Sequence, residues 1–347
     1  MAQRYFWICT VGLFLLACGA QDKDGPSKLN DLRILGLVTE TPEFKLASLI
    51  DTSGQALEVS AIDFHPGDID GRQIDRLYVW QLCFSLGALA KFECLAEDKV
   101  VEMTTDSPSM DLTLDAATLL ALIPEEFLTA EQSPFSTMMT VNSPPDEVCP
   151  EGLGVGCSVD DDCPPSLSCS SEVCEPVPAT SPVPLIVRVT VSSADEQTVT
   201  AARTIGLRFA GELNQNPQFG EFEIGMGRLD APELTTTDDD CVQLGPFDAA
   251  VLSLPIKATF EESSLQAFPY VDEGRCREGD EFESAFVSWY SSSGTFDNQV
   301  ITTDYSDNKL KFESATAETV RVYASLRDGR NGLAMSCFEF ERVVVPQ

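Results

Sequence analysis

Residues 1–18 restrict what the chain can fold into more than any other feature, because their composition bears on the compartment in which the chain folds. A short basic start at residues 1–4 precedes an apolar run, Tyr5–Ala17, that is too short to cross a bilayer as a helix. This order is typical of an export signal, so residues 1–17 are predicted to be a signal peptide that is removed. The rest of the chain is then expected to fold where disulfides form and persist.

The apolar run ends in the sequence Leu-Leu-Ala-Cys-Gly at residues 15–19, which resembles a bacterial lipobox. The resemblance implies that the sulfur of Cys18 receives a diacylglyceryl group, that cleavage follows Ala17, and that the new amine is acylated. Two or more acyl chains anchor a protein stably, whereas one chain binds a membrane only marginally. Residues 18–31 would then be the lipidated cysteine and a tether. The alternative is an ordinary signal peptide with an incidental cysteine.

Residue 19 bears on the membrane to which such a protein is sent. In the bacterial sorting pattern that this segment resembles, Asp directly after the lipidated cysteine favours retention in the inner membrane. Gly19 stands at that position. The resemblance therefore implies the bacterial outer membrane if the source is Gram-negative, and it leaves open whether the protein faces the periplasm or the cell surface.

The cysteine count agrees with export. Of 12 cysteines, Cys9 lies in the signal and Cys18 is the lipidation candidate, which leaves 10. An even number in an exported chain predicts disulfides, although sequence alone does not fix their pairing. Cys83 and Cys94 flank a Gly-containing stretch at hairpin-scale spacing and are expected to pair. The other disulfide candidates are Cys149, Cys157, Cys163, Cys169, Cys174, Cys241, Cys276 and Cys337.

Residues 145–184 form a segment rich in proline and cysteine, and strand-like sequence patterns lie on both sides of it. The spacing of the cysteines at 157, 163, 169 and 174 resembles small extracellular cysteine-rich repeats. Structural zinc sites use closer Cys-x2-4-Cys pairs, so the spacing favours disulfides over zinc. Such a segment buries little apolar surface and depends on its cross-links.

The remaining chain predicts a mainly β fold. Short alternating or apolar runs, bounded by Gly, Pro, Asp or Ser, are typical of β-sandwiches. They occur at 32–38, 57–64, 77–84, 185–191, 320–326 and 338–345. One short helix is expected over 115–122, with Asp115 as its N-cap.

These runs suggest two domains. The predicted order is a first domain at 32–212 that includes the insertion 145–184, a linker at 213–232, and a second domain at 233–347. An alternative places the cysteine-rich segment between two separate domains.

Five stretches resemble a group of myxobacterial surface lipoproteins. They are Leu32–Pro42, Leu77–Cys83, Asn214–Pro217, Ser288–Phe296 and Leu326–Gly332. Together they cover only a small part of the chain, and none is a catalytic signature. The resemblance implies two tandem immunoglobulin-like β-sandwich domains, with the small disulfide-rich insertion standing outside the common pattern, and it leaves the function open.

The charge of the chain excludes some partners. There are 56 acidic and 22 basic residues, with a formal net charge of −34. Nucleic acid is therefore not expected as a partner, because its phosphates would be repelled. The same charge disfavours a body that lies flat on anionic lipid. The expected contacts are the membrane, through the N-terminal lipid, and a protein or glycan partner.

Few residues suggest a chemical site. Asp68, Asp70 and Asp75 are weak calcium candidates, because Asp-x-Asp-Gly opens some calcium loops, but the closing Glu is missing and arginines intrude. His65 is the only histidine, and there is no Gly-x-Ser-x-Gly motif. Trp80 and Trp289 are expected to be core residues, with Tyr290 on the opposite face from Trp289.

These observations favour a non-catalytic, lipid-anchored envelope or surface protein that acts in adhesion, envelope assembly or partner binding. No enzyme activity and no cofactor are expected. Two alternatives stay open. One is a calcium-stabilised adhesive module, and the other is an anchored hydrolase, similar to a glycoside hydrolase, that uses a pair of carboxylates.

Overall fold

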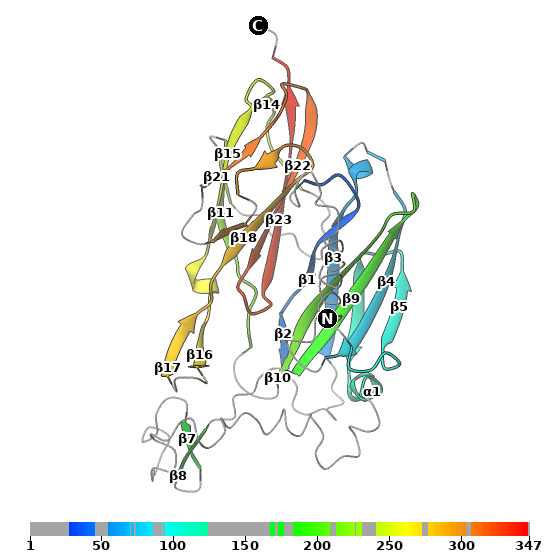
Figure 1. The fold of residues 1–347 in the computed structure, drawn as a ribbon, viewed down its shortest axis with the longest axis vertical. Helices are drawn as coiled ribbons and strands as arrows, with labels where there is room; N and C mark the ends of the chain where they lie inside the picture. The colour runs from blue at the N-terminus through cyan, green and yellow to red at the C-terminus, as the bar shows by residue number, and fades with distance from the viewer. Residues whose placement is uncertain are drawn as a thin grey trace, which may run out of the picture.

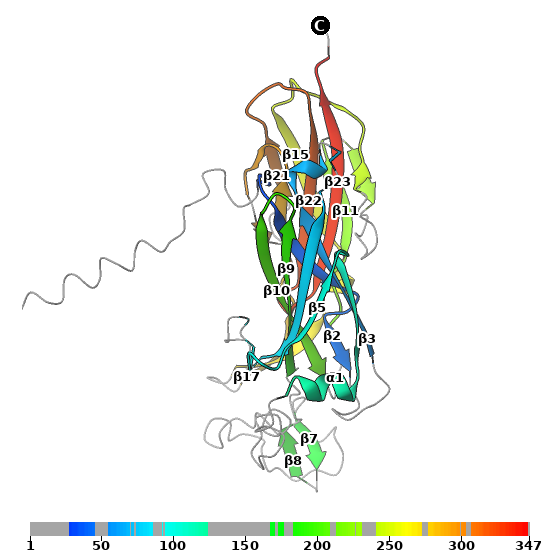
Figure 2. The same ribbon diagram turned by 90° about the vertical axis from the view of Figure 1, so that its right-hand side faces the viewer.

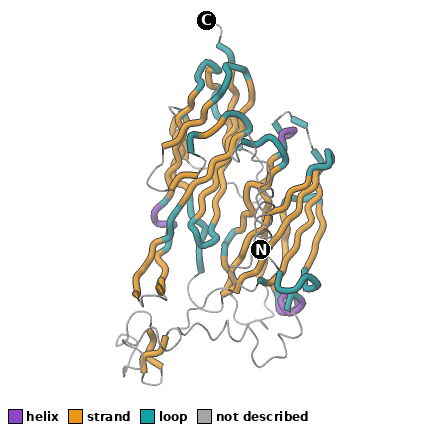
Figure 3. The backbone as a smooth tube through the Cα atoms, viewed as in Figure 1, coloured by secondary structure: helices purple, strands orange, loops and turns teal. Residues whose placement is uncertain are grey.

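The fold was analysed in a computed structural model. The structure describes residues 28–45, 55–69, 71–72, 74–85, 92, 94–123, 167–170, 173–176, 183–208, 213–225, 227–230, 241–272, 277–298, 300–302 and 307–345. Strands dominate these residues (Figure 3), as the sequence predicts, and they form two lobes that lie side by side (Figure 1). We call the lobes the first and the second sandwich, because each consists of two sheets around one apolar core.

The first sandwich packs a sheet of order β1-β3-β6 against a sheet of order β2-β10-β9-β4-β5. The strands of the smaller sheet are β1 (Arg33–Thr39), β3 (Gln55–Phe64) and β6 (Ser109–Leu114). Those of the larger sheet are β2 (Glu43–Lys45), β10 (Thr198–Arg208), β9 (Val183–Ser193), β4 (Arg76–Phe84) and β5 (Val101–Thr105). Neighbouring strands are antiparallel except β2 and β10, which are parallel.

The second sandwich contains a sheet of order β12-β11-β15-β21-β19 and a sheet of order β13-β23-β22-β18-β20. The first of these contains β12 (Gly227–Asp230), β11 (Phe219–Ile224), β15 (Ser253–Phe260), β21 (Asp307–Lys311) and β19 (Thr295–Phe296). The other contains β13 (Val242–Gln243), β23 (Leu333–Val343), β22 (Glu318–Arg327), β18 (Phe286–Ser291) and β20 (Val300–Thr302). β14 (Phe247–Asp248) also pairs with β23, and both β13 and β14 run parallel to it.

Two separate hairpins and three short helical segments complete the described structure. The hairpins are β16 (Ala267–Asp272) with β17 (Arg277–Phe282), and β7 (Leu167–Ser170) with β8 (Val173–Pro176). Two views place β7–β8 beyond one end of the molecule (Figures 1 and 2). The helical segments are η1 (Pro66–Asp68), α1 (Ala116–Ala121) and η3 (Glu262–Ser264). In α1, Asp115 accepts a 2.8 Å hydrogen bond from the amide of Thr118, which confirms it as the N-cap.

Both cores follow from alternation along their strands. In β9 the side chains of Leu185, Val187, Val189 and Val191 are fully buried. Arg188 and Thr190, between them, point to the other face, because successive residues of a strand point to opposite faces. Trp80 is buried in the first core and Trp289 in the second, where it meets Phe222 edge-on. Both tryptophans are therefore core residues, as predicted.

The Pro/Cys-rich segment interrupts the first sandwich. β4 precedes it, β9 begins at its last residues, and the two strands pair from Arg76↔Ser193 to Phe84↔Leu185. The first sandwich is thus completed by strands from both sides of residues 145–184. Of that segment the structure describes only β7, β8 and the first residues of β9.

The second sandwich begins earlier than the sequence suggests. The range 213–232, expected to be a linker, contains β11 and β12. β11 pairs with β15 and buries Phe219, Phe222 and Ile224 in the second core. The linker is correspondingly short and lies at 213–218. The described part of the chain contains no helix with the length and apolarity needed to cross a membrane.

Candidate functional site: the joint between the sandwiches

His65 lies in a hydrogen-bonded cluster at one end of the first sandwich. Its Nδ1 accepts from the amide of Gly67 at 3.0 Å, so Nε2 carries the proton that reaches Asp195 Oδ2 at 3.1 Å. Ser193 donates to the other oxygen of Asp195. A catalytic triad requires the serine to donate to the histidine. Here both groups bind the carboxylate instead, which gives the cluster a structural role.

Of the calcium candidates, the structure describes Asp68 and Asp75. Asp68 binds Arg76 through both oxygens, at 2.5 and 2.6 Å, and accepts from the amide of His65 at 2.8 Å. It is therefore occupied by a cation of the protein and by the capping of η1. Asp70 lies outside the described residues, and the backbone carbonyl of Asp75 accepts from Ala194. Among the described residues, no three His, Cys, Asp or Glu side chains are placed to hold a metal ion.

The expected disulfide between Cys83 and Cys94 is present, with an S–S distance of 2.03 Å. A second disulfide joins Cys241 to Cys337, 96 residues apart, a pairing that the sequence left open. Cys169 and Cys174 are opposite one another in the register of β7 and β8. The other candidates, Cys149, Cys157, Cys163 and Cys276, lie outside the described residues, as does the lipidation candidate Cys18.

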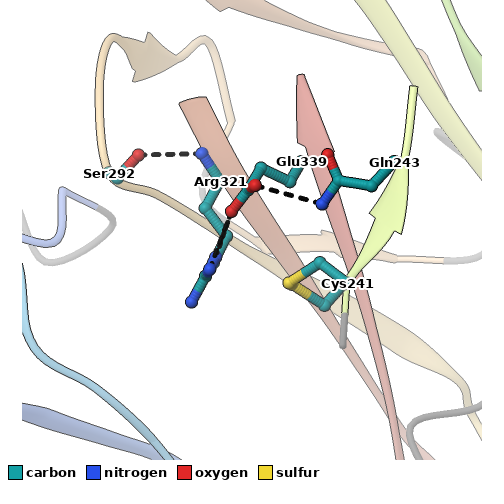
Figure 4. The surroundings of a disulfide bond; sticks show 6 residues. Cys241, Gln243, Ser292, Arg321 and Glu339 are labelled. Atoms are coloured by element: carbon teal, nitrogen blue, oxygen red, sulfur yellow. Dashed lines mark hydrogen bonds and ion pairs between the residues drawn. A yellow bond between two sulfur atoms is a disulfide. The ribbon is translucent and has the colours of Figure 1, made fainter. Parts of the chain in front are cut away.

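The Cys241–Cys337 disulfide attaches β13 to β23 next to a row of polar side chains (Figure 4). In this row Gln243 donates to one oxygen of Glu339 at 3.0 Å, and Arg321 donates to the other at 2.9 Å. Ser292 accepts from the amide of Arg321 at 2.9 Å. β13, β23 and β22 are thus cross-linked side by side by one covalent bond and a line of charge-assisted hydrogen bonds.

This disulfide also belongs to a third apolar cluster, which lies between the sandwiches and which we call the joint. Strand β23 alternates between two cores: Ala334, Phe338 and Phe340 face the second sandwich, whereas Leu333, Met335 and Cys337 face the joint. From the first sandwich the joint receives Leu35, Val38 and Phe64. Phe64 meets Tyr323 of β22 edge-on, at a centroid distance of 6.2 Å.

A glycine permits the close approach of the sandwiches. At Gly36 in β1, a Cβ atom would lie 3.0 Å from Cδ2 of Leu333 and 3.2 Å from Sδ of Met335. Those distances are tighter than ordinary contacts of a Cβ atom, so the side chains of Leu333 and Met335 would have to move to admit a larger residue. The absence of a side chain at this position therefore helps to set the spacing of the joint.

Polar side chains of the linker fasten one rim of the joint. Asn214 is buried, and its Nδ2 donates to Asp328 Oδ2 and to the carbonyl of Arg330, each at 3.0 Å. Its amide donates to Glu43 in β2 at 2.7 Å. Asp328 is also buried, and its Oδ1 accepts from the amides of Arg330 and Gly332. The linker is therefore bonded to the first sandwich and to the β22–β23 turn at the same residue.

Asn216 repeats this arrangement two residues later. Its Nδ2 donates to the carbonyls of Thr39 and Glu40, and its Oδ1 accepts from the amide of Leu333 at 3.0 Å. Arg203 in β10 makes a third bridge, because its guanidinium donates to the carbonyls of Leu37 and Asn331. These three residues each bond to both sandwiches, Asn214 through its backbone amide and its side chain together, and we call them the clasp.

The segment before β1 crosses the joint as well. The amide of Leu29 donates to the carbonyl of Ser291 in β18 at 2.8 Å, and Lys28 forms a parallel bridge with the same residue. The side chain of Leu29 is buried in the joint, and that of Leu32 in the first core. Residues 28–31, predicted to be part of the tether, are thus packed against both sandwiches.

Comparisons with known proteins add no function. No family model and no curated protein matches the chain. A bacterial ice-binding adhesin is 9% identical over 90% of this chain and 64% of its own, with a TM-score of 0.21. The alpha-2-macroglobulin of Escherichia coli is 10% identical over 90% of this chain and 17% of its own, with a TM-score of 0.21. Red sea bream transglutaminase is 8% identical over 91% of this chain and 32% of its own, with a TM-score of 0.20. The chain spans less than two thirds of each, and such TM-scores carry no argument.

Proposed function

We propose that the chain is a non-catalytic lipoprotein of the bacterial outer membrane, whose two sandwiches are held in one fixed orientation for adhesion, envelope assembly or partner binding. The observation that carries this proposal is the joint. An apolar cluster and buried polar side chains connect the sandwiches. Sandwiches that turned freely would expose the apolar cluster to water and would break these hydrogen bonds, and both changes are unfavourable.

The proposal includes two immunoglobulin-like domains. Each lobe contains two mainly antiparallel sheets, and in each an early short strand runs parallel to the last long strand: β2 with β10, and β13 and β14 with β23. A tryptophan is fully buried in each core, Trp80 in the first and Trp289 in the second, and a buried core tryptophan is also a hallmark of immunoglobulin domains. These shared features support two related domains in tandem.

The lipid would attach close to the joint. Ten peptide steps separate Cys18 from Lys28, where the described chain first contacts the second sandwich. A fully extended chain spans at most about 3.6 Å per residue, so this tether reaches roughly 35 Å. The acyl chains would therefore hold this part of the joint within roughly 35 Å of the membrane, while the net charge keeps both sandwiches solvated.

The proposal is tested by replacing Cys18. The Cys18→Ala variant is expected to lose the incorporation of labelled fatty acid and to leave the membrane fraction. Cys9→Ala is the matched control, because Cys9 lies in the predicted signal and would be removed with it. Membrane association of Cys18→Ala equal to that of Cys9→Ala would contradict the lipid anchor.

A further inference from the structure

A cleft of about 330 Å³ opens at the clasp. It lies between β1, β10, the start of β18 and the β22–β23 turn, so both sandwiches form its walls. Its apolar lining includes Ile34, Phe92 and Phe286, and its cations are Arg203 and Arg327. Phe92 is an exposed aromatic side chain, 49% accessible. The volume is at the lower end of that of pockets for small ligands.

Arg203 is a buried cation without a carboxylate partner among the described residues. Its side chain is 8% exposed, and its guanidinium binds the carbonyls of Leu37 and Asn331, two residues that also line the cleft. Burial lowers the pKa of Arg203 to about 10, and the neighbouring Arg327 acts in the same direction. The group is therefore still protonated at neutral pH, and two neutral carbonyls offset its charge only in part.

The nearest acidic group is directed elsewhere. Asp328 is close enough to favour the charged form of Arg203, but its oxygens accept from Asn214 and from the amides of Arg330 and Gly332. The carboxylate of Asp328 is thus used by the turn. An anion entering the cleft would meet two arginines and would supply the missing partner of Arg203.

We propose that the cleft binds a small apolar acid, with its carboxylate at Arg203 and Arg327 and its apolar body against Ile34, Phe92 and Phe286. Guanidinium groups suit carboxylates better than ammonium groups do, because they are planar and present several donors. The large negative charge of the whole chain does not prevent this binding, because at physiological salt the Debye length is about 8 Å. Nearby arginines therefore determine the local field.

Benzoate is the first probe, and benzyl alcohol is its uncharged counterpart. We expect ligand-observed saturation-transfer NMR on the full mature chain to show binding of benzoate and none of benzyl alcohol. In Arg327→Gln, benzoate should bind about tenfold more weakly, because one charge-assisted contact is lost. Arg327 is exposed and belongs to no described joint contact, so this variant should fold. Lys309→Gln, which removes an exposed cation of the second sandwich, is the matched control.

Arg203→Gln should abolish benzoate binding. If that variant does not fold, the comparison of Arg327→Gln with Lys309→Gln decides. Equal signals from benzoate and benzyl alcohol, or equal affinities in the Arg327 and Lys309 variants, would overturn the proposal. Tighter binding of phenyl phosphate than of benzoate would overturn the assignment of a carboxylate.

Discussion

Removing the Cys241–Cys337 disulfide should destabilise the protein more than removing Cys83–Cys94. The first closes a loop of 96 residues and the second a loop of 11. In the chain-entropy model, the stabilisation grows with the logarithm of the loop length. The model gives about 4.7 kcal/mol for the long loop, about 2.8 kcal/mol for the short one, and thus a difference of about 1.9 kcal/mol.

In each variant both cysteines are replaced by alanine. Cys241 and Cys337 are both buried, at 7% and 1% exposed, whereas in the other pair Cys83 is buried, at 2% exposed, and Cys94 is half-buried. The loss of buried sulfur therefore adds to the effect of loop length, and both favour a larger loss of stability in the Cys241/Cys337 variant.

The assay uses the tryptophans. Apart from Trp7 in the predicted signal, the chain contains only Trp80 and Trp289, one in each core. Equilibrium unfolding in urea, followed by fluorescence in the wild type and in Trp80→Phe and Trp289→Phe backgrounds, reports each sandwich separately. We expect the Cys241/Cys337 variant to lose more free energy of unfolding, first at Trp289. An equal or larger loss in the Cys83/Cys94 variant would refute the reasoning from loop length.

Three further predictions concern the clasp and the cluster around Asp195. Gly332→Ala would place a Cβ atom in collision with Asp328 Oδ2, so we expect the free energy of unfolding in urea to fall by about 1–3 kcal/mol. At Gly245 no atom lies within 4 Å of the added Cβ atom, so Gly245→Ala should leave the stability nearly unchanged. Asn214→Ala leaves two buried acceptors unpaired, so it should lower the free energy of unfolding by about 1–3 kcal/mol and separate the unfolding transitions of the two sandwiches. Coincident, unshifted transitions would argue against the clasp. The hydrogen bond from Ser193 lowers the pKa of Asp195 to about 2, so this carboxylate adds stability above its unfolded pKa near 3.8 that is lost as the pH falls through 2. The stability difference between wild type and Asp195→Asn should shrink over that range, and a constant difference would exclude this linkage.

The parts of the fold that depend on local sequence could be predicted. The position of Trp80 beside Cys83 indicated a core residue, the spacing of Cys83 and Cys94 indicated their bond, and Asp115 marked the start of the helix. Each of these inferences uses residues that are close in sequence, where strand periodicity, loop closure and capping act directly.

The joint could not be predicted, because its contacts join residues far apart in the sequence. Asn214 and Asp328 are separated by 114 residues, and nothing near either residue indicates the other. The predicted linker was too long for a different reason. The Asn-Gln-Asn-Pro sequence suggested a loop, but Phe219, Phe222 and Ile224 directly after it already carried a partial strand pattern. The turn residues indicated a loop more strongly than these apolar residues indicated a strand, so β11 was not predicted.

The joint also explains the role of several polar residues that the sequence alone does not indicate. The stretches 32–42, 214–217 and 326–332 suggested a resemblance without a role, and the structure brings all three together. Asn214 and Asp328 bond to each other and, like Asn216, to backbone groups, although Oδ1 of Asn214 has no partner among the described residues. The side chains that look most suited to binding are therefore used to hold the sandwiches in place. Arg203 differs from them because it is buried at the same place and lacks an acidic partner among the described residues. A ligand at this position would contact both sandwiches, so its binding should also stabilise the joint, by an amount that rises with ligand concentration.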